Sequence, residues 1–148
     1  MEAADLARAC AMKMIEGDEV RRALGIEIAS VAPGAAVATM LVRRDMLNSR
    51  EMCHGGVIFS LADTAFAYAC NSHDVATVAQ NCSIAFLAPA RLGDVLTATA
   101  REAALAGRSG VYDVAVRRQD GSPIAEFQGL SRSIGGSVLA EGRRAAKD

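Results

Sequence analysis

Apolar residues recur at helical spacing in the first part of the chain. Leu6, Cys10 and Met14 lie four positions apart, and no Pro or Gly interrupts the segment. This spacing puts the three side chains on one face of a helix, which predicts a short helix over residues 3–15. Gly17 is expected to end it, so residues 1–17 are assigned to an N-terminal helix.

The pattern changes to alternation after residue 25. Residues typical of strands, mostly apolar, recur at every second position over residues 26–28 and 37–41. The turn residues Pro33 and Gly34 lie between the two stretches, so the pattern predicts a β-hairpin. Strand-like patterns return after residue 71, with a hairpin turn at Asp120–Gly121. They predict four further strands, within residues 75–90, 94–107, 109–122 and 123–136. The remaining segment, residues 137–148, is expected to be a disordered tail.

The most apolar segment lies between these two groups of strands. It reads "GGVIFSLADTAFAYACN" over residues 55–71, and its one charged residue is Asp63. A helix over residues 56–71 would be apolar nearly all round, so it must be covered on most sides. Strands joined by hairpins can curl around it. The sequence therefore predicts an α+β fold, in which a curved antiparallel sheet wraps one long central helix, with residues 1–148 forming a single domain.

Composition narrows the classes of function. The net charge is −1, with no basic excess to favour nucleic acid, and no apolar run reaches the roughly 18 residues of a membrane span. The N-terminal segment lacks the apolar stretch of a signal peptide. The four cysteines form no C-x-x-C pair and there are only two histidines, so we expect no metal site and a reducing, cytoplasmic location.

Asp63 is the residue in this helix that packing does not explain. Burying an isolated carboxylate costs several kcal/mol unless it is paired or protonated, and no Lys or Arg lies within two helical turns. Ser60 and Thr64 are the polar neighbours expected beside it. Asp63 is therefore either a structural carboxylate with a partner elsewhere in the fold, or a general base or nucleophile facing a cleft.

The start of the same helix offers a complementary feature. Gly55 and Gly56 leave backbone N–H groups free at a helix N-terminus, with no Cβ to block a ligand. Such groups suit a developing oxyanion, although an ordinary Gly-Gly turn is the simpler interpretation of the two glycines alone. His54 fits either a catalytic role or the beginning of the helix. Gly55 and Asp63 are separated by about 12 Å of helix, so a shared site requires a two-fold dimer.

These residues resemble a known family. The motif "N-x5-HGG-x3-S-LAD", from Asn48 to Asp63, is similar to that of the hotdog-fold acyl-CoA thioesterases, and above all to their phenylacetic-acid-degradation type. "GDVLTATA", "GVYDV" and "S-x-x-IGG" extend the likeness over residues 15–137. The resemblance implies hydrolysis of an aryl- or arylacetyl-CoA, a homodimer with shared active sites and a homotetramer made of two dimers. No cofactor is implied, because coenzyme A arrives as part of the substrate.

The resemblance also implies roles for individual residues. Asp63 is similar to the family's nucleophile or general base, and Gly55 to the residue whose N–H polarises the thioester carbonyl. Asn48 resembles the side chain that orients water or that carbonyl. Thr64 corresponds to an accessory residue beside the acid, and His54 to a residue that orients the helix start or contacts the thioester.

Substrate-binding residues are expected in two further places. The turn of Arg108, Ser109 and Gly110 offers a basic surface for the phosphates of coenzyme A, although a solvated hairpin is the simpler interpretation. Phe59 lies one helical turn from Asp63, where it either lines an acyl pocket or packs in the core. Gly56 is assigned to substrate binding with Gly55.

Three alternatives remain open at this point. A hydratase or dehydratase on the same fold would use His54 and Asp63, but the position six residues before His54 is Asn48 rather than an acid. A non-catalytic acyl-CoA-binding module would not need the acid. A Cys53–His54–Asp63 triad would require two adjacent residues to converge on one reacting atom.

Overall fold

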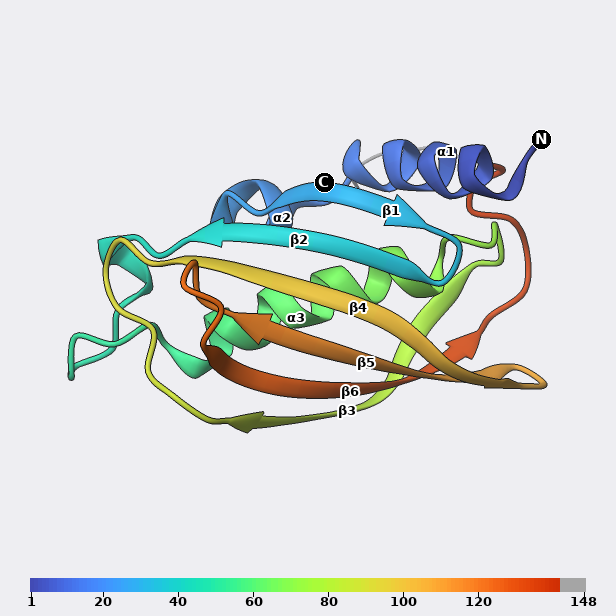
Figure 1. The fold of residues 1–148 in the computed structure, drawn as a ribbon. Helices are drawn as coiled ribbons and strands as arrows, with labels where there is room; N and C mark the ends of the chain where they lie inside the picture. The colour runs from blue at the N-terminus through green and yellow to red at the C-terminus, as the bar shows by residue number, and fades with distance from the viewer. Residues whose placement is uncertain (142–148) are drawn as a thin grey trace, which may run out of the picture.

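A curved antiparallel sheet wraps one long helix in the computed structural model, which describes residues 1–141 (Figure 1). The predicted α+β architecture is therefore confirmed. In chain order the elements are α1 (Ala3–Ile15), α2 (Glu19–Leu24), β1 (Glu27–Ala32), β2 (Ala35–Leu41), the 3₁₀ helix η1 (Arg44–Met46), α3 (Gly55–Cys70), β3 (Thr77–Phe86), β4 (Val95–Ala106), β5 (Ser109–Arg117) and β6 (Pro123–Ser133).

The six strands form one sheet in the order β1-β2-β4-β5-β6-β3. The chain leaves β2, passes through α3 and returns on the opposite edge as β3, so α3 is held against the face of the sheet (Figure 1). Register shifts interrupt several pairings, for example between Ala79 and Asn81 in β3. Such bulges increase local twist and help the sheet to curve. One edge of β3 has no strand partner among the described residues.

The core lies between α3 and the concave face of the sheet. Tyr112, Val114 and Val116 point inward from β5, as their alternation predicts, and all are buried. Opposite them, Phe66 of α3 fits against β6 at Gly129, where an added Cβ would lie 2.7 Å from the ring. Only a glycine permits this close approach, which fixes how α3 sits in the sheet.

The sequence interpretation missed α2. It treated residues 16–19 as the end of one helix and continued directly into a strand, whereas a second helix of six residues begins at Glu19. Asp18 caps this helix by accepting a hydrogen bond from the Arg21 N–H at 3.2 Å, and Gly25 ends it with φ +66°. An N-cap aspartate followed by a C-terminal glycine is the signal that could have identified it.

The C-terminal segment differs from the expected disordered tail as far as it is described. The side chain of Val138 is only 2% exposed, and Asp74 accepts hydrogen bonds from the Ser137 hydroxyl at 2.8 Å and from the Leu139 N–H at 2.9 Å. Residues 137–139 are therefore packed against the turn that follows α3. The rest of the predicted tail, residues 142–148, lies outside the described residues.

No helix within residues 1–141 is both long enough and apolar enough to span a membrane. Over the same residues, no cluster of His, Cys, Asp and Glu side chains has the arrangement of a metal site.

Candidate active site

The start of α3 presents one free backbone donor. His54 is the N-cap, and its Nδ1 accepts a hydrogen bond from the Gly56 N–H at 3.0 Å. Gly55 is the first helical residue, and its N–H has no hydrogen-bond partner within the described part of the chain. Of the two glycine donors proposed from the sequence, only that of Gly55 is therefore available to a ligand. His54 acts within one chain as the residue that begins the helix.

A cavity of about 390 Å³ opens beside Gly55. Asn48 and Gly55 both line it, so the structure brings these two predicted site residues together. The ring of Phe86 covers Gly55 so closely that an added Cβ would lie 3.0 Å from it. The remaining lining residues are Met52, Cys53, Ile58, Leu87, Ala88 and Pro89.

Asn48 is held in place by the loop that it organises. Its side-chain oxygen accepts hydrogen bonds from the N–H groups of Arg50 at 2.9 Å and Met52 at 3.2 Å. Its backbone N–H donates to the Met52 carbonyl at 2.8 Å. These bonds leave the side-chain amide N–H₂ as the group that Asn48 can offer to a ligand, and that group is a donor.

Asp63 is half-buried and lies midway along α3. Its carboxylate has no hydrogen bond or ion pair with any other residue in the range 1–141. Burial raises the pKa of Asp63 above its ordinary value, and the negative charge of Asp18 raises it further. Asp18 itself accepts a hydrogen bond from the Tyr68 hydroxyl at 3.0 Å. The structural alternative, a carboxylate satisfied by a partner elsewhere in the fold, therefore finds no partner in the described chain.

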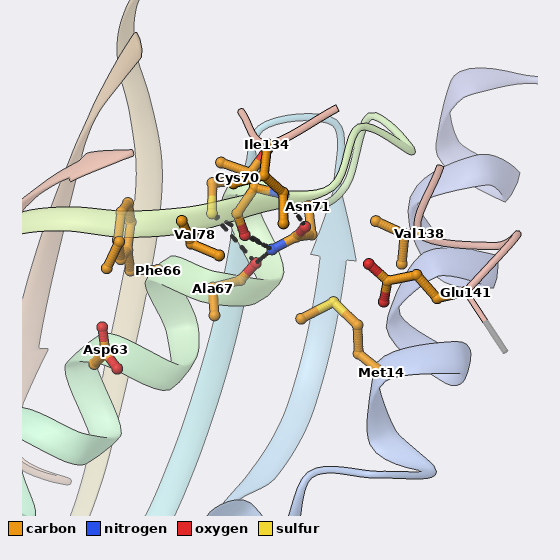
Figure 2. Close-up of a pocket in the computed structure, with 12 residues that line it drawn as sticks. Met14, Asp63, Phe66, Ala67, Cys70, Asn71, Val78, Ile134, Val138 and Glu141 are labelled. Atoms are coloured by element: carbon orange, nitrogen blue, oxygen red, sulfur yellow. Dashed lines mark hydrogen bonds between the residues drawn. The ribbon is translucent and has the colours of Figure 1, made fainter. Parts of the chain in front are cut away.

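A second cavity, of about 370 Å³, lies in front of Asp63 (Figure 2). Its lining was not anticipated from the sequence, although part of it follows helical spacing. Residues three, four, seven and eight positions after Asp63 share its face of the helix. The lining residues are Met14, Asp63, Phe66, Ala67, Cys70, Asn71, Thr77, Val78, Ala79, Ile134, Val138 and Glu141.

Ser60 and Thr64 do not accompany Asp63 as expected. The Ser60 hydroxyl donates to the Gly56 carbonyl at 2.9 Å, and the Thr64 hydroxyl donates to the Ser60 carbonyl at 2.7 Å. Thr64 is buried and lines neither of these two cavities. Its hydroxyl is used within the helix, so in one chain it makes no contact that would mark it as an accessory to the acid.

The remaining predicted substrate-binding residues line neither of these two cavities. Phe59 packs edge-on against Phe127, with ring centroids 5.3 Å apart, and belongs to the periphery of the core. The turn containing Arg108 lies at the opposite end of the sheet from the start of α3 (Figure 1). There Arg108 and Ser109 line a smaller cavity of about 180 Å³ with His73, while Gly110 is buried.

The proposed cysteine triad does not assemble within the chain. Cys53 lines the cavity beside Gly55, whereas Asp63 lines the other one. Burial raises the pKa of the Cys53 thiol to about 11, so little of it is the reactive thiolate at neutral pH. The His54 Nδ1 is occupied by the Gly56 N–H.

Comparison with known proteins places this geometry in a family. Residues 51–125, which include both Gly55 and Asp63, match the family described as the Thioesterase superfamily. The chain belongs to the thioesterase superfamily. The resemblance inferred from the sequence motif is thereby confirmed, together with the hotdog fold and the enzyme class of a thioesterase.

Two proteins illustrate how close the chain is to other members of the thioesterase superfamily. It is 50% identical over 128 residues to the acyl-coenzyme A thioesterase PaaI of Escherichia coli K12, which covers 86% of this chain and 91% of that protein. The solved structure of E. coli PaaI, from the phenylacetic acid degradation operon, superposes with a TM-score of 0.90 over 92% of this chain and 99% of that one, at 48% identity. A Streptococcus mutans protein solved bound to acetyl CoA gives a TM-score of 0.73 at 27% identity, over 76% of this chain and 90% of that one.

Proposed function

We propose that this thioesterase hydrolyses acyl-CoA thioesters whose acyl group is aryl or arylacetyl, of the phenylacetyl or hydroxyphenylacetyl type. The observation that carries the proposal is Asp63, a half-buried carboxylate without a partner in the described chain that faces a mostly apolar cavity. The similarity to a protein named an acyl-coenzyme A thioesterase, from a phenylacetic acid degradation operon, supports both the CoA ester and the aromatic acid.

The active site is proposed to form between two subunits. Gly55 and Asp63 line different cavities, and about 12 Å of helix separates them. β3 has an unpaired edge and exposes Val78 and Phe86, the kind of edge that pairs with a second copy of itself. Such a two-fold dimer would set the two α3 helices side by side and bring Gly55 of one subunit to Asp63 of the other. The further expectation of a homotetramer is retained as part of this proposal.

The chemistry follows from the two groups. Asp63, ionised, removes a proton from a water molecule as the water oxygen bonds to the thioester carbon, or attacks that carbon directly to give an anhydride that water then opens. The carbonyl oxygen gains negative charge, which the N–H of Gly55 from the other subunit stabilises. The carbon–sulfur bond breaks, the CoA thiolate takes up a proton, and the free acid is released. The thiolate is a good leaving group, so the proposal assigns no cofactor.

The other residues take supporting roles in this proposal. The free amide N–H₂ of Asn48 donates to the carbonyl oxygen from the same side as Gly55, and His54 holds the helix start that aims the Gly55 N–H. Arg108 and Ser109 are proposed to contact the phosphates of coenzyme A. Gly56, Thr64, Phe59 and Gly110 then act by shaping the helix and the hairpin rather than by touching the reacting atoms.

Release of free thiol from a panel of acyl-CoAs tests this function. The panel contains phenylacetyl-, hydroxyphenylacetyl-, benzoyl-, acetyl- and long-chain acyl-CoA, assayed with the wild type and Asp63→Asn. We expect selective release from the arylacetyl thioesters, reduced by about 10²-fold or more in the variant, as for loss of a catalytic base. Absence of release from every substrate would reject the proposal. Crotonyl-CoA absorbance and equilibrium acyl-CoA binding would then identify a hydratase or a binding module.

A further inference from the structure

The cavity at Asp63 is elongated along α3. Five of its lining residues, spaced at i, i+3, i+4, i+7 and i+8, form one face of that helix, namely Asp63, Phe66, Ala67, Cys70 and Asn71. This face extends over about 12 Å from Asp63 to Asn71. Figure 2 shows Asp63 at one end, and Met14, Val138 and Glu141 gathered at the other. The cavity therefore runs from the Asp63 carboxylate to a wall formed by the side chains of Met14 and Val138.

Two segments from opposite ends of the chain build this wall. Met14 comes from the last turn of α1, and Val138 from the segment that follows β6. Both side chains are apolar, Met14 half-buried and Val138 almost fully buried. Neither segment belongs to residues 51–125, which match the superfamily and contain Asp63. The wall is therefore built by parts of the chain that flank these residues on both sides.

Asp74 fixes the wall in place. It lies in the turn after α3, and its Oδ1 accepts hydrogen bonds from the Ser137 hydroxyl and the Leu139 N–H, on either side of Val138. The thiol of Cys10, on α1, lies 3.9 Å from the same oxygen. Asp74 adopts φ +60°, a conformation that is uncommon outside glycine and is best tolerated by Asp and Asn. The catalytic helix, α1 and the C-terminal segment thus meet at one carboxylate.

We propose that Met14 and Val138 set the length of the acyl group that the enzyme accepts. In this arrangement, which rests on the proposed hydrolysis at Asp63, the acyl group extends from the thioester along the apolar face of α3 and stops at the wall. A phenylacetyl group is well short of the 12 Å face, whereas a fully extended long-chain acyl group exceeds it. The wall therefore selects compact acids, and Asp74 is a positioning residue for it.

Paired substitutions of Met14 test the wall in both directions. Met14→Ala lengthens the cavity. We expect it to raise the ratio of kcat/KM for dodecanoyl-CoA to kcat/KM for phenylacetyl-CoA by about tenfold or more, since each methylene in an apolar pocket is worth at least that factor. Met14→Phe shortens the cavity and should lower the ratio. Met12→Ala is the matched control, because Met12 lies on the same helix but is 71% exposed. It should leave the ratio unchanged.

Val138→Ala and Asp74→Asn extend the test, with thermal melting to show that each variant is folded. Val138→Ala should move the ratio in the direction of Met14→Ala. Asp74→Asn keeps the side-chain shape but weakens the acceptor, and it should move the ratio in that direction too. If wild type and Met12→Ala hydrolyse phenylacetyl-CoA but neither Met14 variant changes the ratio, the wall proposal is overturned and the proposed function stands. If the wild type hydrolyses no thioester, the proposed function itself fails.

Discussion

Gly55 and Asp63 belong to the same helix, yet they line two different cavities of the same chain. Within residues 1–141, the N–H of Gly55 at the first position of α3 has no hydrogen-bond partner, and neither has the carboxylate of Asp63 two turns later. Neither group can reach the other's cavity, because about 12 Å of rigid helix separates them. A reaction that uses both groups therefore needs two copies of the chain.

The N–H of Gly55 can be removed without removing the helix. Proline is well suited to the first helical position, and His54, with φ −59° and ψ 134°, already has a conformation compatible with a following proline. We expect Gly55→Pro to lower kcat by about 10²–10³-fold, as for loss of one oxyanion donor. Gly55→Ala is the matched control, because both variants place a Cβ against the ring of Phe86 but alanine keeps the backbone N–H of residue 55. Equal losses in the two variants would contradict the donor role.

A shared site can be tested by mixing two inactive variants. Subunits of Asp63→Asn and Gly55→Pro, unfolded and refolded together in equal amounts, should form about half heterodimers, each with one intact site and one doubly defective site. The mixture is expected to regain about a quarter of the wild-type activity. Each variant refolded alone provides the control. If the mixture stays as inactive as its components, the two groups do not act across a dimer interface.

The pH dependence of hydrolysis should reflect the environment of Asp63. Burial and the charge of Asp18 raise its pKa, and the proposed reaction needs the ionised form. The value of kcat/KM should therefore rise with pH, and the midpoint of this acidic limb should lie above about 3.9, the ordinary value for aspartate. Asp18→Asn removes one of the two causes and should move the limb to lower pH. A limb that stays in place in this variant would contradict the assignment of the limb to Asp63.

The ionised carboxylate of Asp63 should lower the free energy of unfolding. Its pKa is raised in the folded state, so the folded state holds the proton more tightly than the unfolded state does. Ionisation of Asp63 therefore costs stability as pH rises through the unfolded value, about 3.9, and the full cost is present above the folded pKa. Asp63→Asn should melt at a higher temperature than wild type at pH 7.5, and the gain should shrink towards pH 4. A lower melting temperature at pH 7.5 would indicate a structural role for the carboxylate.

Much of the fold followed from patterns that act locally. Alternation and turn residues predicted all six strands, and the continuous apolar run predicted α3, because a helix of that kind has to be wrapped. The short α2 was missed because its evidence is in its caps, Asp18 and Gly25, rather than in periodicity. Six residues provide too little pattern to outweigh a helix end and a following strand.

The candidate site was predictable only where it lies on one element. The motif from Asn48 to Asp63 identified the groups at the start and middle of α3, and the length of the helix implied two subunits. Met14 and Val138 could not be anticipated in the same way. They come from opposite ends of the chain and meet only because Asp74, in the turn after α3, binds the C-terminal segment close to α1.

The role of His54 can be separated from that of the residues it supports. Its Nδ1 caps α3 through the Gly56 N–H, and loss of an N-cap acceptor costs about 1 kcal/mol, so His54→Ala should lower the melting temperature by about 2–4 °C in a chain of this size. His54→Asn retains a side-chain oxygen that can accept the same bond, and it should melt close to wild type.

The hydrolysis rate of these variants then shows whether His54 acts only as a helix cap or as a catalytic residue. If the asparagine variant keeps both stability and most of the hydrolysis rate, His54 acts by aiming the Gly55 N–H. If stability is kept but the rate falls by about 10²-fold, the imidazole takes part in the reaction itself.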